Sequence, residues 1–168
     1  MPDLSYGEAV NAALHRLMEE LPETLVYGED VGVPGGVFGV TRGLRKQYGD
    51  RAFDTPISES AILGSAVGAA MFGRRPIVEI MWADFSLVAL DQIVNQAANV
   101  RYVSAGRLRA PLTIRTQQGT RPAPARSTRS AWRRCSCTCR GCACACRAHL
   151  RTPTTCWSPP CTATTRRW

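Results

Sequence analysis

The first 120 residues predict an α/β domain with a doubly wound, mainly parallel sheet. Three features of the sequence support this fold class. Segments with apolar residues at helical spacing alternate with short runs of β-type residues, as in a layered α/β sheet. The apolar run at 76–81 predicts a buried strand, and Gly- and Pro-rich turns separate the segments. A chain of 168 residues with 45% hydrophobic content can bury such a core.

The N-terminal elements follow from local signals. Ser5 and Glu8 form an S-x-x-E capping box, and apolar residues then recur at helical spacing to about Leu21. These features predict a helix. A β-type run at 24–27 predicts the first strand. The segment V-G-V-P-G-G-V-F-G at 31–39 predicts a loop, because Gly and Pro permit turns and interrupt periodic patterns.

The remaining elements continue this alternation. Ser58 is the expected N-cap of a helix at 59–72, and the Ala, Gly and Ser residues of that helix let another backbone approach closely. The other expected elements are helices at 42–48 and 84–102 and strands at 51–54, 76–81 and 111–115.

Candidate site residues follow the predicted strands. In open α/β sheets, sites form beyond the carboxyl ends of the strands. Glu29, Glu59 and Phe85 all fall just after predicted strands, so we expect a site that contains them.

Four sequence blocks then identify a family. They are G-E-D-V (28–31), G-G-V-F-G-V-T-R-G-L (35–44), F-D-T-P-I-S-E-S (53–60) and A-D-F-S-L-V-A-L-D-Q-I-V-N-Q-A-A (83–98). From about Leu4 to Gly119, the chain resembles the β subunit of thiamine-diphosphate-dependent 2-oxo acid dehydrogenases of the pyruvate, branched-chain and acetoin type. The resemblance implies the transketolase-like pyrimidine-binding domain.

The resemblance implies a catalytic carboxyl group. Thiamine must lose a proton from its thiazolium carbon, and its own aminopyrimidine acts as the base once a carboxyl group exchanges a proton with a ring nitrogen. In the family this group is the Glu of T-P-I-S-E, which is Glu59 here. The start of a helix favours its carboxylate form, whereas burial beside an apolar cofactor opposes it. Without the motif, Glu59 is equally a helix-capping acid.

Further residues match the family's cofactor pocket. Phe85 would pack on the pyrimidine face, and Glu29 and Met81 match positions that line the same pocket. Plain core packing is the alternative for Phe85 and Met81, and a strand-ending turn is the alternative for Glu29. The family also holds a structural potassium ion with backbone carbonyls, and the positions that match are Ala110, Leu112 and Thr113.

The resemblance also implies partners. In the family, an α subunit binds the diphosphate and its Mg²⁺ through a G-D-G…N motif, which does not occur in this sequence. The chain is therefore expected to act in an α₂β₂ assembly, decarboxylating a small 2-oxo acid and passing the acyl group to a lipoyl-bearing acyltransferase. Alone, it is expected to be inactive. Half of a transketolase or of a deoxyxylulose-phosphate synthase is a second interpretation.

The charge and the cysteines divide the chain at Thr120. Residues 1–120 hold 11 Lys and Arg against 13 Asp and Glu, a formal net charge of −2, and no cysteine. Residues 121–168 hold 10 Arg, all 8 Cys and no acid. The basic excess of +8 therefore gives no reason to expect nucleic-acid binding by the domain. With no secretory signal or long apolar run, a cytoplasmic protein without membrane contact is expected.

Six of the cysteines lie within 135–146. Their mostly C-x-C spacing differs from the C-x₂₋₄-C pairs of zinc sites, although a metal- or nucleic-acid-binding tail is the alternative from another class. A shift of reading frame just before or at Thr120 fits better. Cys codons would then become Leu, Val or Met codons, and the shifted sequence resembles the family's continuation, including a Q-H-S histidine. We therefore expect 121–168 to be an out-of-frame, disordered tail after a truncated domain.

Overall fold

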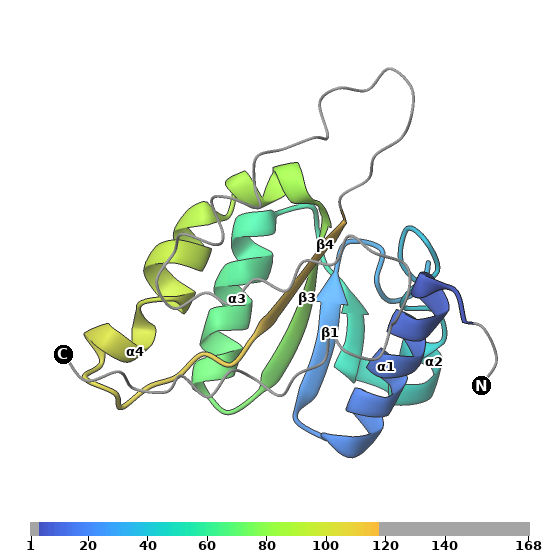
Figure 1. The fold of residues 1–168 in the computed structure, drawn as a ribbon, viewed down its shortest axis with the longest axis horizontal. Coiled ribbons are helices and arrows are strands. Elements are labelled where there is room, and N and C mark those ends of the chain that lie inside the picture. Colours follow the sequence, from blue (N-terminus) through green and yellow to red (C-terminus); the bar gives the residue numbers. More distant parts are fainter. Residues whose placement is uncertain (1–3, 118–168) are drawn as a thin grey trace.

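The computed structural model describes residues 4–117, which form the predicted α/β architecture (Figure 1). A four-stranded sheet lies at its centre. In sheet order, its strands are β2 (Ala52–Asp54), β1 (Thr24–Gly28), β3 (Arg75–Trp82) and β4 (Thr113–Gln117). All three pairings between neighbouring strands are parallel, which confirms the predicted sheet type.

Helix α1 (Tyr6–Glu20) begins at the predicted capping box. The Ser5 side chain accepts the N–H of Glu8, and the Glu8 carboxylate accepts the backbone N–H of Ser5 at 2.8 Å. The apolar face of α1 packs against the sheet and contributes to one core cluster. That cluster contains Leu14, Met18, Val26, Val31, Val40, Leu44, Ala52 and Ile77.

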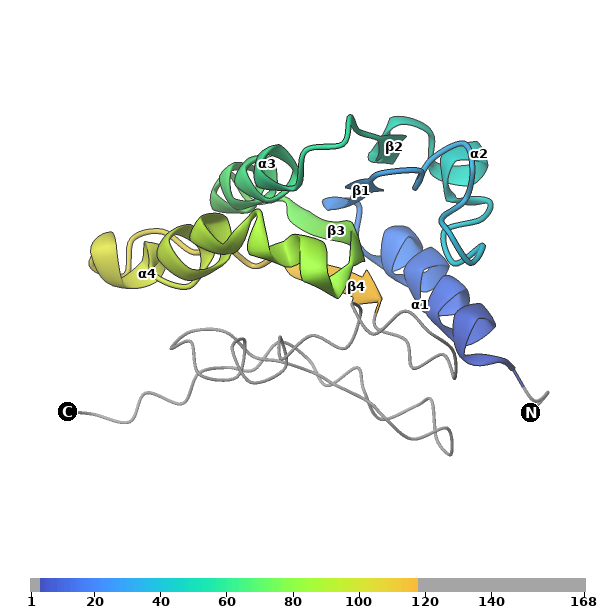
Figure 2. The same cartoon turned by 90° about the horizontal axis from the view of Figure 1, so that it is seen from above.

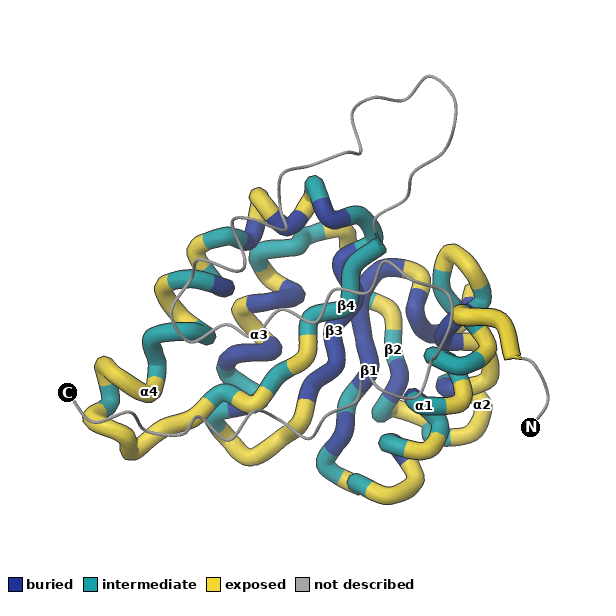
Figure 3. Tube along the Cα trace, in the orientation of Figure 1, coloured by how far each residue is buried: buried dark blue, intermediate teal, exposed yellow. Residues whose placement is uncertain are grey.

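Helix α3 (Glu59–Met71) lies on the opposite face of the sheet from α1 (Figure 2). Its buried residues form a second core cluster with β1, β3 and the segment after β3. That cluster contains Tyr27, Ile62, Leu63, Ala66, Val78, Ile80, Ala89 and Ile93. Because β1 and β3 are covered on both faces, they are deeply buried in the middle of the sheet (Figure 3). The doubly wound arrangement is therefore confirmed.

Helix α2 (Leu44–Tyr48) is short and begins two residues later than predicted. Gly43 precedes it with a φ of 86°, a left-handed conformation that cannot belong to the helix. A 3₁₀ turn, Gly49–Arg51, then leads directly into β2.

The predicted single helix at 84–102 is wrong. The segment consists of a 3₁₀ helix (Ala83–Leu87), a π-helical turn (Gln92–Ala97) and the short helix α4 (Val100–Val103). The buried Ala89 and Ile93 still pack into the second core cluster. The conformation of this segment therefore depends on how its buried residues pack against other elements, and not on a regular helical spacing of apolar residues.

Several predictions concern residues outside the described range. All eight cysteines and the tail at 121–168, expected to be out of frame and disordered, lie beyond residue 117. Within residues 4–117, no cluster of His, Asp and Glu side chains is arranged to hold a metal ion. In the same range, no helix is both long and apolar enough to cross a membrane.

Candidate active site at the carboxyl edge of the sheet

The strand register brings the carboxyl ends of β1 and β2 to the same edge of the sheet, beside β3. Gly28, the last residue of β1, pairs with Asp54 of β2 and with Glu79 of β3. A Cβ on Gly28 would lie 2.5 Å from the Glu79 carbonyl oxygen, so any side chain at this position would force β1 and β3 apart. This close approach sets the position of the end of β1 and therefore of the next residue, Glu29.

Glu29 directly follows β1, and Glu59 begins α3 after β2. Glu29 is buried, with 9% of its surface exposed, and Glu59 is the half-buried first residue of α3. Burial raises the pKa of Glu29, and the nearby Glu59 and Asp30 carboxylates raise it further. A carboxyl group in such a position retains its proton more readily than a solvated one. Glu29 is thus suited to hold a proton beside the Glu59 carboxylate.

The environment of Glu29 predicts a pH-dependent gain in stability for Glu29→Gln. A raised pKa means that the ionised carboxylate destabilises the folded state near pH 7, and Gln removes this cost. The melting temperature should therefore rise at pH 7, and the gain should disappear below the ordinary pKa of 4.5, where Glu29 is protonated in both states. Thermal melts from pH 4 to 8 measure this.

Glu8→Gln is the matched control for that prediction. Hydrogen bonds from Ser5 lower the pKa of Glu8, so this variant should lose stability at pH 7 and approach the parent at low pH. A Glu29→Gln protein that is less stable than the parent at pH 7 would contradict the assigned environment of Glu29.

Met81 and Phe85 lie at and just beyond the end of β3. Met81 is half-buried in the strand, and Phe85 lies in the 3₁₀ helix that follows. The Phe85 side chain is 42% exposed and belongs to neither core cluster. Within the described residues, plain core packing therefore does not explain Phe85. The neighbouring Trp82 makes an edge contact with Phe38, with ring centroids 6.4 Å apart.

The predicted potassium ligands lie elsewhere. Ala110 and Leu112 precede β4, and Thr113 begins it opposite Ile77, towards the amino ends of the strands. The carbonyl oxygen of Ala110 accepts the N–H of Leu112 at 2.9 Å. The structure therefore does not bring these carbonyls together with Glu29 and Glu59, and a potassium site there stays a prediction.

Two polar features near the edge were not expected from the sequence. Glu79, only 3% exposed, forms an ion pair with Arg115 on β4, which is its partner in the strand register. Asp54 accepts backbone N–H groups from Gly32 and Val33, at 2.6 and 3.0 Å. The only sequence signal for the Glu79–Arg115 pair was an acid within the apolar run I-V-E-I-M. The Asp54 contact has no sequence signature beyond the block that contains Asp54.

Comparison with known proteins agrees with this fold. The sequence pattern of the transketolase pyrimidine-binding domain matches residues 3–133. A split-gene transketolase, described as an inactive beta4 tetramer, superposes with a TM-score of 0.55 at 22% identity. The superposition covers 69% of this chain and 34% of that one, and at this identity it concerns the fold alone.

Three curated relatives are β subunits. The 2-oxoisovalerate dehydrogenase subunit beta of Bacillus subtilis and the pyruvate dehydrogenase E1 component subunit beta of Staphylococcus epidermidis are each 46% identical over 120 residues, which is 71% of this chain. The acetoin:2,6-dichlorophenolindophenol oxidoreductase subunit beta of Cupriavidus necator is 44% identical over 126 residues, covering 69% of this chain. The chain spans 37% of the length of each. The resemblance to 2-oxo acid dehydrogenase β subunits is thereby confirmed, and the chain belongs to the family of transketolase pyrimidine-binding domains.

Proposed function

We propose that this chain forms the pyrimidine side of a thiamine-diphosphate site in a 2-oxo acid dehydrogenase β subunit. The observation that carries the proposal is the Glu29–Glu59 pair at the carboxyl edge of the sheet. Bound thiamine diphosphate would supply the carbon nucleophile and the electron sink for decarboxylation. A buried carboxyl group with a raised pKa near a second carboxylate, next to a strand end that is followed by an exposed aromatic ring, fits an aminopyrimidine chemically.

Each residue has a distinct proposed role. Glu59 exchanges a proton with a ring nitrogen of the pyrimidine, and the buried Glu29, whose pKa is raised, is a second proton-holding group nearby. Phe85 offers a ring face for stacking, while Met81 lines the pocket at the end of β3. None of the four can neutralise a diphosphate, because none is cationic.

We therefore infer that a second subunit binds the diphosphate. We infer an α subunit that binds the diphosphate through Mg²⁺, in an α₂β₂ assembly, and a lipoyl-bearing acyltransferase that accepts the acyl group. Three relatives named as subunits of dehydrogenases or an oxidoreductase support this inference. Because the chain spans 37% of their length, such an assembly needs the rest of the β subunit. We further propose that the reading frame shifts just before or at Thr120, and we call the β subunit with that shift corrected the frame-restored protein.

Reconstitution tests the function. The frame-restored protein, mixed with an α subunit of the same family, should reduce 2,6-dichlorophenolindophenol when given a 2-oxo acid, and only in the presence of thiamine diphosphate. Pyruvate and 2-oxoisovalerate are the substrates to compare, because relatives are named for each. Turnover of a ketose phosphate and not of any 2-oxo acid would instead identify half of a transketolase.

A further inference from the structure

The segment after Glu29 connects two parts of the candidate site. This β1–α2 loop, residues 31–43, leaves the end of β1 and carries Phe38, whose ring contacts Trp82 at the end of β3. Within the loop, the Thr41 hydroxyl donates to the Val31 carbonyl at 2.7 Å. Its far end is bound by α1, where the Asn11 amide donates to the carbonyl of Val40, also at 2.7 Å.

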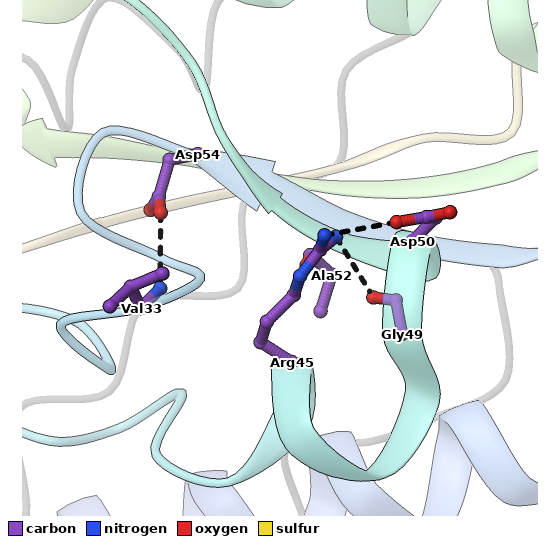
Figure 4. Close-up of polar contacts among 6 residues, drawn as sticks. All are labelled: Val33, Arg45, Gly49, Asp50, Ala52 and Asp54. Carbon is purple, nitrogen blue, oxygen red and sulfur yellow. Dashed lines mark hydrogen bonds and ion pairs between the residues drawn. The ribbon is translucent and has the colours of Figure 1, made fainter.

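The near end of the loop is held by Asp54. One carboxylate oxygen accepts the N–H of Gly32. The other accepts the N–H of Val33, as Figure 4 shows. Hydrogen bonds to a charged acceptor are stronger than those to a neutral one. The contact is also tight, because a Cβ on Gly32 would lie 2.9 Å from a carboxylate oxygen of Asp54. Asp54 itself is the last residue of β2, so it links the loop to the sheet.

We propose that Asp54 is a positioning residue for Glu29: by binding the two amides at the start of the β1–α2 loop, it keeps that carboxyl buried beside Glu59. Only Asp30 and Val31 separate Glu29 from the first of these amides. Release of the loop would therefore let water reach Glu29. That the buried Glu29 carboxyl serves a cofactor rests on the proposed function. That Asp54 holds Glu29 in its buried position does not.

A substitution of Asp54 changes both the position of the loop and the charge near Glu29. Besides burial, the groups that raise the pKa of Glu29 are Glu59 on α3 and Asp30, which directly precedes the loop. Gly32→Ala alters the contact of the loop with Asp54 but keeps every charge, so comparing it with Asp54→Asn separates the effect of loop position from that of charge.

Asp54→Asn in the full 168-residue chain tests the proposal. Its amide oxygen can accept one N–H, but its NH₂ group would face the other. We expect amide exchange at Gly32 and Val33 to become about tenfold faster or more, since each loses a charge-assisted bond. We also expect the titration midpoint of Glu29, followed by carboxyl ¹³C NMR, to move down towards the ordinary value of 4.5.

Asp50→Asn is the matched control, because the same chemical change is made four residues away. The Asp50 side chain is 98% exposed and pairs with Arg45 outside the loop (Figure 4). Both readouts should stay at their parent values. Gly32→Ala is a second test that keeps every charge, since its added methyl group pushes against the Asp54 carboxylate. It should lower the titration midpoint of Glu29, as Asp54→Asn does.

The outcomes are distinct. A lower Glu29 midpoint in folded Asp54→Asn and Gly32→Ala, with Asp50→Asn unchanged, supports the positioning role. An unchanged midpoint in either folded variant overturns it. Loss of the fold in both variants also overturns it, because Asp54 would then serve the stability of the sheet as a whole. None of these readouts requires cofactor or turnover, so failure here is distinguishable from failure of the proposed function.

Discussion

Glu59→Gln in the frame-restored protein, paired with its α subunit, is expected to lower kcat by roughly 10²- to 10⁴-fold, the usual range for loss of a positioned proton-transfer group. Gln has nearly the same shape as Glu, but its amide cannot exchange a proton with the pyrimidine. Because Glu59 is only half-buried at the start of α3, the assembly should survive the change. Steady-state kinetics together with size-exclusion chromatography measure both effects.

Glu20→Gln makes the same chemical change at a distance from the site. Glu20 pairs with Arg16 on the exposed surface of α1, so its loss should cost little stability and leave kcat near the parent value. Near-normal turnover by Glu59→Gln would show that another group activates the cofactor. Equal losses in the two variants would point to a general effect of altered charge.

Glu79→Leu should be the most destabilising single change considered. It would leave the Arg115 guanidinium, which is 20% exposed, beside an apolar side chain between β3 and β4. Breaking a buried ion pair by removing one partner typically costs about 3–5 kcal/mol in the free energy of unfolding. Urea titration of the full chain, followed by circular dichroism, gives that free energy.

The double variant Glu79→Leu/Arg115→Leu provides the matched comparison. With both charges removed, two apolar side chains can pack between the strands, and such replacements of buried ion pairs are often neutral or stabilising. The double variant should therefore recover most of the stability lost by Glu79→Leu. A double variant as unstable as Glu79→Leu would mean that the ion pair itself stabilises the fold, beyond avoiding an unpaired buried charge.

Local sequence signals predicted most of the fold. The capping box at Ser5 placed the start of α1, and the apolar runs placed the strands to within two residues. These signals act between residues close in the chain, so a single sequence contains them. The segment 84–102 was mispredicted because its shape depends on packing of Ala89 and Ile93 against other elements.

The site was only partly predictable. Glu29, Glu59 and Phe85 could be proposed because each follows a strand, and parallel strands bring such positions to one edge. The Glu79–Arg115 pair joins residues 36 positions apart and depends on the register between β3 and β4, which the sequence did not reveal. The contact of Asp54 with two loop amides depends on the conformation of 31–33, which composition alone does not determine.

Cofactor titration tests the central claim most directly, namely that this chain supplies one side of a shared thiamine-diphosphate site. Isothermal titration should detect no useful binding of thiamine diphosphate and Mg²⁺ to the frame-restored protein alone, because the pyrimidine-side residues carry no cation for the diphosphate. An equimolar mixture with the α subunit should bind one cofactor per αβ pair. Micromolar binding by the β chain alone, or no binding by the mixture, would contradict the account.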